Sequence, residues 1–384
     1  MKKILIPIAF FYPSQIGGPC NSVYAITQTI KEQFEIFVLT TNYGIKDFDK
    51  PINIWNDAYD INIYYKNYTT FRDLYKINPF SYIKDIKPDI VYLNSVFSPL
   101  SQYFAFTCRL YKIHYLWSPR GEIDKGALGV KSTKKNLFVN IPFIKSNLKN
   151  AVFHFTHEME KEGFSKRFPF LNKNKYFIIP NIKEDNLKNQ KYKNPYPFEY
   201  LLYLGRISPK KNLQSLLKAF TLLNDASLKL IIAGDVNEDR DYYDQLLNLV
   251  NKNKMNDKII FTNKRVEGSE KNSLYKNAKL FVLPSISENF GQVVVEALSL
   301  GTPVIASKGT PWQLLEQYEA GYWVEPDEMS IKNAICDYLR KNELEKEEMK
   351  KNAIKLSNQF DSNILKASYI KMFNEVINNE SIKI

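Results

Sequence analysis

The first half of the chain alternates between short apolar runs and longer amphipathic stretches. Its apolar runs are rich in β-branched and aromatic residues and predict buried strands at KKILIPIAFF, FEIFVLTTN, INIYYK, DIVYLNS, HYLWSP, VFHFTH and YFIIPN. Helical stretches fall between several of these runs, the first of them near SVYAITQTIKEQ. Strands that alternate with helices form parallel βαβ units, so this half predicts a doubly wound α/β domain.

A polar segment interrupts this pattern, and the pattern then restarts. Residues 183–198, KEDNLKNQKYKNPYPF, are charged and contain two prolines, which predicts a linker. Beyond it, strands are predicted at YLLYLGRI, LKLIIAGD, KIIFTN, KLFVLPS and TPVIAS, followed by a helical tail. A chain of 384 residues is too long for one ordinary core. We therefore predict domains at 1–187 and 188–361, with a C-terminal helix at about 362–384 that packs back on the first domain.

Glycines and basic residues follow the first predicted strand of each domain. Gly17 and Gly18 would let the backbone approach a ligand closely at the start of a helix, where an anion binds well. A simple tight turn also explains such a pair, and no GxGxxG fingerprint accompanies it. In the second domain, Arg206 can bind a phosphate with its forked guanidinium, and Lys211 can supply a point charge. A solvated turn with incidental charges is the alternative for these two residues.

The stretch SENFGQVVVEALSLGTPVIAS, residues 287–307, places two carboxylates in apolar surroundings. Glu288 precedes a helix that is predicted to begin near Gly291, and Glu296 shares a face of that helix with Gln292. An ionised carboxylate in such surroundings costs free energy unless it is paired or hydrogen-bonded. A glutamate at the edge of the core, paired with a lysine, explains Glu296 alone. Carboxylates that bind sugar hydroxyls explain the whole arrangement, so we expect substrate hydroxyls rather than protein groups to be their partners.

Together these motifs resemble the retaining glycosyltransferases of family four. That family has the GT-B fold, in which two Rossmann-like doubly wound domains face each other across a cleft. The resemblance rests on Glu288 and Glu296 with NFG between and GTPVIAS after, on the GR…K pattern of Arg206 and Lys211, and on the inter-domain segment IPN at 179–181. SPRGEIDKGAL at 118–128 and GTPWQLLE at 309–316 are similar to bacterial surface-polysaccharide members. The matches span nearly the whole chain.

The resemblance implies a role for each matched residue. The implied catalytic residues are Arg206, Lys211 and Glu288. The implied donor-binding residues are Gly17, Gly18, Asn289, Phe290, Gly291 and Glu296. In this interpretation the two basic residues hold the donor diphosphate and stabilise the charge that develops as it leaves. Glu296 holds the ribose, Glu288 and the amides of 289–291 hold the sugar, and the glycine loop closes on the donor.

The same resemblance implies that configuration is retained without an assured protein nucleophile, with the leaving phosphate accepting the proton of the acceptor. It implies no metal and no cofactor, a UDP- or GDP-sugar as donor, and a glycan or polyprenyl-diphosphate-linked acceptor in O-antigen or capsule synthesis. One departure stands out. Many members have a histidine where this chain reads SPRG, so Arg120 takes its place. Arg120 is therefore expected to contact either the sugar or an acceptor phosphate.

Composition narrows the partners and the compartment. The net charge of +12 fits an anionic partner, such as phosphorylated metabolites, an anionic membrane or nucleic acid, but no nucleic-acid motif is present. Cys20, Cys108 and Cys336 have no metal-type spacing, which indicates a reducing compartment and a cytoplasmic protein, either free or peripheral on the inner face of the membrane. The segment 129–151 mixes lysines with apolar residues. It is either a membrane-surface segment or a domain helix with its apolar side in the core.

Two other functions remain open at this point. A nucleotide-sugar epimerase or a phosphorylase can have the same fold, although the lysine environment that pyridoxal requires is not recognisable here. A non-enzymatic, basic polyanion-binding protein would explain the positive charge but not two carboxylates at strand ends. The Asp-x-Asp pairs DFD at 47–49 and DRD at 239–241 resemble a metal pair of the other main glycosyltransferase fold, but both lie in polar loops, and we assign no metal.

Overall fold

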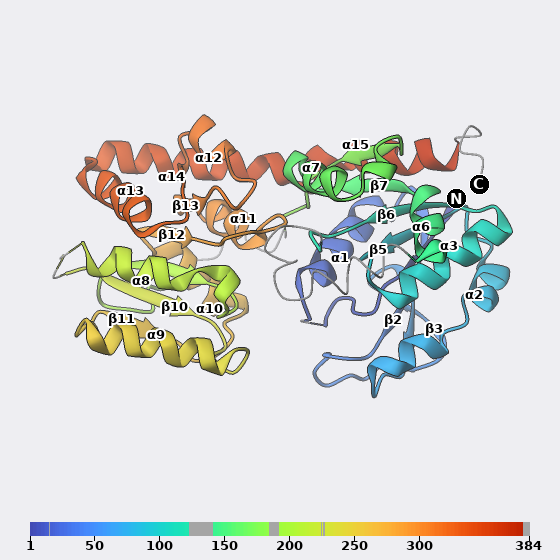
Figure 1. Ribbon diagram of the computed structural model, residues 1–384, viewed down its shortest axis with the longest axis horizontal. Helices are drawn as coiled ribbons and strands as arrows, with labels where there is room; N and C mark the ends of the chain where they lie inside the picture. Colours follow the sequence, from blue (N-terminus) through green and yellow to red (C-terminus); the bar gives the residue numbers. More distant parts are fainter. Residues whose placement is uncertain (15, 123–140, 184–191, 224, 226, 379–384) are drawn as a thin grey trace. The chain divides into compact units, whose positions relative to one another are not determined.

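The computed structural model describes residues 1–14, 16–122, 141–183, 192–223, 225 and 227–378, and it divides into two compact units (Figure 1). Unit 1 comprises Met1–Ile182 and Ser362–Ile384, and unit 2 comprises Lys183–Asp361. The boundary predicted at residue 187 falls within 184–191, outside the described residues.

Unit 1 is built on an eight-stranded sheet with the strand order β3-β4-β2-β1-β5-β6-β7-β8. Its strands are parallel except β3, which runs antiparallel to β4. The elements are β1 Lys2–Pro7, α1 Gly18–Ile30, β2 Phe34–Thr41, β3 Trp55–Ala58, β4 Ile61–Lys66, η1 Phe71–Lys76, α2 Pro79–Ile86, β5 Ile90–Asn94, α3 Pro99–Tyr111, β6 His114–Ser118, α6 Pro142–Lys149, β7 Val152–Phe155, α7 Glu158–Arg167, η2 Pro169–Leu171, β8 Tyr176–Ile178 and α15 Ser362–Ile377.

The sheet of unit 1 separates two hydrophobic cores. One core contains α3 and α6, and the other contains α1 and α15. Helix α15 contributes Leu365, Tyr369, Met372, Phe373 and Val376, whose spacing places them on one helical face. The hydroxyl of Tyr369 also donates to the carbonyl of Pro180 at 2.9 Å. The C-terminal helix is therefore an integral part of the core of unit 1.

Unit 2 has a six-stranded parallel sheet with the order β11-β10-β9-β12-β13-β14. The elements are β9 Tyr200–Leu204, η3 Pro209–Lys211, α8 Leu213–Thr221, β10 Lys229–Ala233, α9 Arg240–Lys252, β11 Ile259–Phe261, α10 Gly268–Asn277, β12 Leu280–Leu283, α11 Gln292–Ser299, β13 Val304–Ser307, α12 Leu314–Gln317, β14 Gly321–Val324, α13 Glu328–Arg340, α14 Glu343–Ser357 and η4 Asn358–Phe360. The central strands β9 and β12 are almost entirely buried, as continuous apolar runs predict for a parallel sheet.

The predicted strands and the helical tail are confirmed, but two strands were missed. Strand β3 carries a polar sequence, WNDA, and β14 is short and partly exposed, so neither has a strong hydrophobic pattern. Gly321 permits β14 to pair closely with β13, because a Cβ at this position would lie 1.9 Å from the carbonyl oxygen of Val304.

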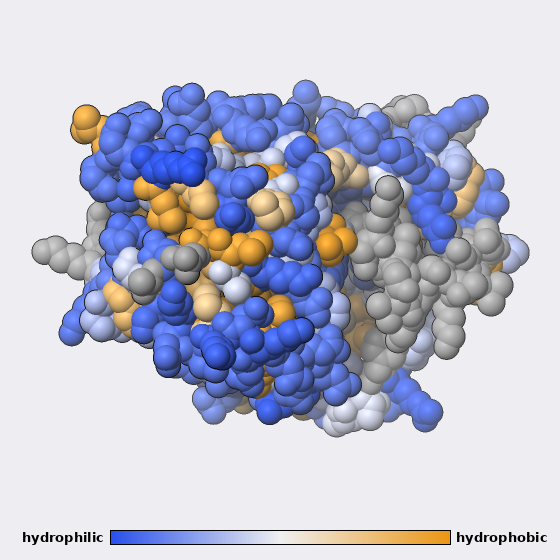
Figure 2. All heavy atoms as spheres, turned by 60° about the vertical axis from the view of Figure 1, so that its left-hand side comes forward, coloured by the Kyte–Doolittle hydropathy of each residue, from blue (hydrophilic) through white to orange (hydrophobic). Residues whose placement is uncertain are grey.

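The linker prediction was wrong for its described part. Tyr192, Tyr196 and Phe198 pack against the core of unit 2, and the rings of Tyr196 and Phe198 stack with centroids 5.1 Å apart. Residues 192–198 therefore belong to the packed structure of unit 2. Figure 2 brings the left-hand side of Figure 1 forward; hydrophilic residues cover most of its coloured surface, and the largest group of hydrophobic residues lies left of the centre of the view.

Candidate functional site

The strand order of unit 2 reverses direction between two neighbouring strands, β9 and β12. Ligands of doubly wound sheets bind at such a switch point, outside the carboxyl ends of the strands. The loop after β9 carries Arg206 and Lys211, and the loop after β12 carries Glu288. The amide of Ile286 donates to the carbonyl of Lys210 at 2.9 Å and joins the two loops. Residues far apart in the sequence thus meet where the sheet topology predicts a site.

Lys211 and Glu288 form an ion pair at this point. The ammonium of Lys211 donates to Oε1 of Glu288, and the side chains are only 13 % and 14 % exposed. The hydroxyl of Ser285 donates to the same oxygen at 3.0 Å, and the amide of Glu288 donates to the carbonyl of Gly309 at 3.0 Å. The carboxylate is therefore held from several sides by unit 2 itself.

The charge state of Glu288 follows from this pairing. Burial alone would raise the pKa of the carboxyl, but the charge and hydrogen bond of Lys211 more than offset burial and lower the pKa below its ordinary value. Glu288 is therefore ionised at neutral pH. A lysine ammonium has three N–H donors, so Lys211 can bind Glu288 and still donate to another anion.

Arg206, in the same loop as Lys211, is exposed to solvent. Its side chain is exposed, and within the described part of the chain it makes no ion pair or side-chain hydrogen bond. Its carbonyl accepts from the hydroxyl of Tyr203 at 2.6 Å, which fixes the backbone of the loop. Arg206 also lowers the pKa of Glu238, a residue of the loop after β10, although burial raises that pKa overall. The sequence analysis did not identify Glu238.

Helix α11 begins where the sequence predicts, after Gly291. This glycine has φ 75°, and a Cβ there would lie 3.2 Å from Nε1 of Trp312. Trp312 donates to the carbonyl of Phe290 at 2.6 Å, and the ring of Phe290 is buried against Trp312 and Phe360. Phe290 can therefore offer a ligand its backbone amide but not its ring. This agrees with the expectation that the amides of 289–291, rather than their side chains, bind the donor. No described side chain caps the helix, and its first turn has no acidic residue.

Glu296 has protein partners, and so does Glu288. Lys271 lies 3.0 Å from Oε1 of Glu296, and the hydroxyl of the buried Tyr275 donates to Oε2 at 3.1 Å. The expectation that substrate hydroxyls rather than protein groups pair with the two carboxylates was therefore wrong.

The partners of Glu296 were also missed by sequence reasoning. Lys271 and Tyr275 are four residues apart on α10, which is a spacing that places them on one helical face. That spacing was a usable signal. Their contact with a carboxylate on α11 was not, because it depends on how the two helices pack.

In unit 1, the glycine loop lies where the sequence placed it, at the N-terminus of α1. Gly17 has φ 80° and precedes the helix, and Pro19 stands in its first turn. A Cβ at Gly18 would meet no described heavy atom within 4 Å, so the backbone borders open space there. The first turn has no acidic residue and no side-chain cap among the described residues, which suits an anion.

The side chain of Arg120 belongs to a buried hydrogen-bond network in unit 1. Its side chain donates to Asn94 at 2.9 Å, to Asn181 at 3.0 Å and to the hydroxyl of Tyr92 at 2.9 Å. That hydroxyl also bonds Nδ1 of His154 at 2.7 Å. Three of the five N–H donors of Arg120 are thus used to hold the ends of β5 and β6 to the IPN segment. This bonding gives Arg120 a structural role; a contact with substrate stays a prediction.

Burial and charge set the protonation states in this network. Burial lowers the pKa of His154 to about 3, with Arg120 adding to the effect, so His154 is neutral. Burial also raises the pKa of Glu160, which accepts from the amides of Gly121 and Thr156, both at 2.7 Å. The sequence analysis missed the network because its members come from separate strands.

The remaining candidate features have structural roles where they are described. His157 caps α7 by accepting from the amide of Glu160 at 3.1 Å, and Asp239 of the DRD pair caps α9 through the amide of Tyr242. No group of three or more His, Cys, Asp or Glu residues that could hold a metal occurs among the described residues. Within the same part of the chain, no helix is long and apolar enough to cross a bilayer.

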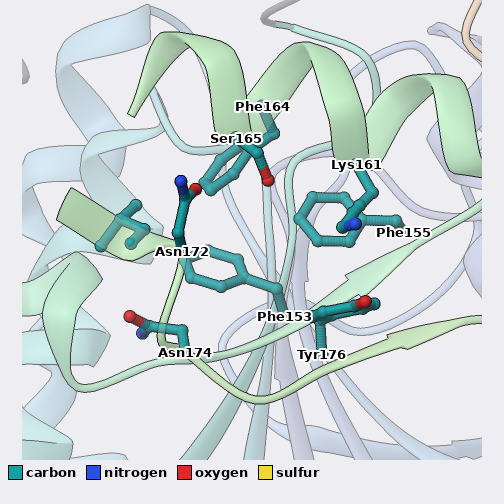
Figure 3. Close-up of a pocket in the computed structure, with 9 residues that line it drawn as sticks. Phe153, Phe155, Lys161, Phe164, Ser165, Asn172, Asn174 and Tyr176 are labelled. Carbon is teal, nitrogen blue, oxygen red and sulfur yellow. The ribbon is translucent and has the colours of Figure 1, made fainter. Parts of the chain in front are cut away.

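A separate cavity of about 310 Å³ lies in unit 1 between α7 and strands β7 and β8. Figure 3 shows the rings of Phe153 and Phe155 at its centre, with Lys161 and Tyr176 at one side. The ammonium of Lys161 lies 5.0 Å from the centroid of the Tyr176 ring. None of the predicted site residues lines this cavity, so it is distinct from the candidate site.

Solved structures share this two-unit architecture. Anabaena HepE in complex with UDP and glucose matches with a TM-score of 0.73 at 16 % identity, over 98 % of this chain and all of that one. The chain therefore has the GT-B fold of glycosyltransferases, with two α/β domains on parallel sheets.

The sequence of unit 2 is similar to a known family. Residues 184–356 match the family model for glycosyl transferases group 1. The chain is 29 % identical over 324 residues to alpha-monoglucosyldiacylglycerol synthase of Streptococcus pneumoniae, covering 78 % of this chain and 70 % of the relative. It is 28 % identical over 205 residues to the O-antigen chain mannosyltransferase RfbU of Salmonella typhimurium, covering 52 % and 55 % of the two chains.

Proposed function

We propose that this protein is a retaining glycosyltransferase that moves a sugar from a nucleotide-sugar donor to a glycan or lipid-linked acceptor in bacterial surface-polysaccharide synthesis. The observation that carries the proposal is the β9–β12 switch point, where Lys211, from the same loop as Arg206, pairs with Glu288 just before the N-terminus of α11. HepE binds UDP and glucose, and RfbU is an O-antigen mannosyltransferase, which supports the donor class and the pathway.

In the proposed mechanism the donor diphosphate binds to Arg206 and to the free N–H groups of Lys211. The ammonium is already fixed by Glu288, and the backbone of Arg206 is held by Tyr203 with its side chain open to a ligand, so both cations can meet the negative charge that develops on the leaving group. Fixed charges of this kind stabilise a transition state without reorganisation at the moment of reaction. No metal is required, because the two cations neutralise the phosphates.

The carboxylates and helix α11 would orient the rest of the donor. Glu288 and the backbone of 289–291 hold the sugar, and Glu296, held by Lys271 and Tyr275, accepts from the ribose hydroxyls. The leaving phosphate takes the proton of the acceptor hydroxyl on the face where the new bond forms, which retains the configuration. A lipid-linked acceptor would place the protein on the cytoplasmic surface of the membrane.

A thermal-shift panel of UDP-, GDP- and ADP-sugars tests the donor class. A ligand at about 100 times its Kd stabilises the folded protein by about 2.7 kcal/mol, so the cognate donor raises Tm clearly above the others. Arg206→Ala should abolish this shift and lower turnover by about 100-fold or more, because it removes a preorganised charge. Arg240→Ala, which changes an exposed arginine of α9 with a surface ion partner, is the control. The proposal fails if no nucleotide sugar shifts Tm, or if Arg206→Ala turns over like the wild type.

A further inference from the structure

Helix α3 of unit 1 has an apolar stripe that faces solvent. Its inner face buries Leu100, Phe104 and Cys108 in the core. On the opposite side lie Tyr103, the half-buried Phe106 and Leu110, at the i, i+3, i+7 spacing of one helical stripe. Leu110 is 57 % exposed. Surface helices normally carry polar residues at such positions, so the stripe calls for a partner.

Three neighbouring elements, η1, α2 and α6, contact α3, and Figure 1 shows α2 and α6 near α3. Three ring pairs connect α3 to η1, α2 and α6; they are Tyr75–Tyr103, Phe80–Tyr111 and Phe106–Phe143, with centroids 6.0, 6.2 and 5.1 Å apart. We call the outer surface of these four elements the α3 face; its exposed apolar residues are Tyr75, Phe80, Tyr103, Leu110, Tyr111 and Ile141.

The same four elements are strongly basic. Including the caps of α2 and α3, they contain the acidic residues Asp73 and Asp85 against eight basic ones: Arg72, Lys76, Lys84, Lys87, Arg109, Lys112, Lys145 and Lys149. Asp73 is already neutralised by Lys76 at 2.8 Å. Lys84 lies four residues after Phe80, so this lysine and this ring share one face of α2, whereas Lys145 lies over the ring of Phe170 and Arg109 donates to Asn147. This charge favours an anionic partner.

We propose that the α3 face docks on an anionic phospholipid bilayer. Tyrosine and phenylalanine settle at the boundary between headgroups and acyl chains, while lysines bury their stems and keep their charges at the headgroups. Leu110 and Ile141 offer aliphatic surface that suits acyl chains and offers nothing to a nucleic-acid base. A second copy of the chain would bring like charges together.

This surface differs from the membrane segment expected from the sequence. Residues 129–140 of that segment lie outside the described residues, and in its described part α6 buries Ile144 and Leu148 in the core. Helix α6 therefore turns its apolar side into the core and borders the α3 face through Ile141 and Phe143. The inference adds to the membrane location in the proposed function, but it depends on no step of sugar transfer.

Vesicle co-sedimentation of the full-length protein without donor tests the inference. We expect binding to phosphatidylcholine vesicles that contain about 30 % phosphatidylglycerol and little binding to phosphatidylcholine alone, because each lysine near an anionic surface contributes about fivefold in affinity. Binding should weaken from about 0.15 M to about 1 M salt as the screening length falls. Equal binding to both vesicle types, or binding to neither, overturns the proposal.

Paired variants place the binding on the α3 face. Tyr103→Ser with Leu110→Ser should weaken binding at least tenfold, and Lys84→Glu with Lys112→Glu should weaken it about 25-fold or more. Leu344→Ser and Lys355→Glu, both at exposed positions of α14 in unit 2, should bind as the wild type. Unchanged Tm values and unchanged sugar transfer to a soluble acceptor separate this result from misfolding and from failure of the proposed function. Wild-type binding by the α3-face variants, or duplex DNA binding in place of vesicle binding, overturns the proposal.

Discussion

Replacing Lys211 should destabilise unit 2 in a way that depends on pH. Lys211→Met keeps most of the volume of the side chain but removes the cation that pairs with Glu288. Because the two side chains are only 13 % and 14 % exposed, Glu288 loses its counter-ion in surroundings from which water is largely excluded. Breaking a buried pair costs about 3–5 kcal/mol. The hydrogen bond from Ser285 remains, so we expect the free energy of unfolding to fall by about 2–4 kcal/mol at pH 7.

The sign of the pH effect follows from the pKa of Glu288. In the wild type this pKa is lowered, so the pair contributes stability above the ordinary glutamate pKa, and that stability is lost as pH falls through the lowered value. In Lys211→Met, burial remains and raises the pKa of Glu288, so the folded variant binds a proton more readily than the unfolded chain. The variant is therefore penalised most at high pH, and its deficit should shrink as pH falls from about 7 to about 5.

Urea unfolding followed by circular dichroism at both pH values measures the deficit. Lys308→Met is the matched control, since Lys308 pairs with Glu325 at 3.0 Å in the same unit but the side chains are 45 % and 58 % exposed. Exposed pairs contribute about 0–1 kcal/mol. Adding Glu288→Gln to Lys211→Met should recover much of the lost stability. The reasoning is refuted if Lys211→Met costs no more than Lys308→Met, or if its deficit is the same at both pH values.

Three further predictions concern single groups. Gly291→Ala should lower the free energy of unfolding by about 1–3 kcal/mol, because φ is 75° and the new Cβ would crowd a tryptophan, whereas Gly18→Ala, with open space beside it, should be nearly neutral in the same urea assay. Acidification from about pH 7 to 5 should lower the free energy of unfolding by about 2 kcal/mol through His154, because in this range His154 is protonated in the unfolded chain but, with a pKa of about 3, stays neutral in the folded protein. A His154→Gln variant whose free energy of unfolding falls equally with pH would contradict this. Tyr275→Phe removes one donor to Glu296 and should raise KM for the nucleotide sugar about two- to tenfold, a penalty that should vanish with a dideoxyribose donor; an equal penalty with that donor would show that the tyrosine acts elsewhere.

Local pattern was sufficient to find every strand except β3 and β14, and the residues that follow the apolar strands. The strands β9 and β12 are continuous apolar runs, and a residue that leaves the carboxyl end of such a run lies at the edge of the sheet wherever the strand is placed. That is why local sequence pattern was enough to nominate Arg206, Lys211 and Glu288 as site residues. The start of α11 was equally readable, because glycine is the residue that adopts φ 75° without strain.

The pairing between distant residues could not be predicted from the sequence. Lys211 is 77 residues from Glu288, and no local period connects them; they meet because β9 and β12 are neighbours in the sheet. The same holds for Arg120, which the sequence predicted to contact a ligand. In the fold its guanidinium donates to residues of β5 and of the IPN segment, which lie far from it in the sequence.

The sequence by itself determined that this protein has two doubly wound α/β domains and which residues stand at the ends of their strands, because periodicity and turn chemistry act over a few residues. Only the tertiary structure decided what those residues touch. It gave Glu288 a lysine and Glu296 a lysine and a tyrosine where substrate hydroxyls were expected. The physical reason is that a buried charge is balanced by whatever the folded chain brings within hydrogen-bonding distance, and sheet order and helix packing, not sequence separation, set that distance.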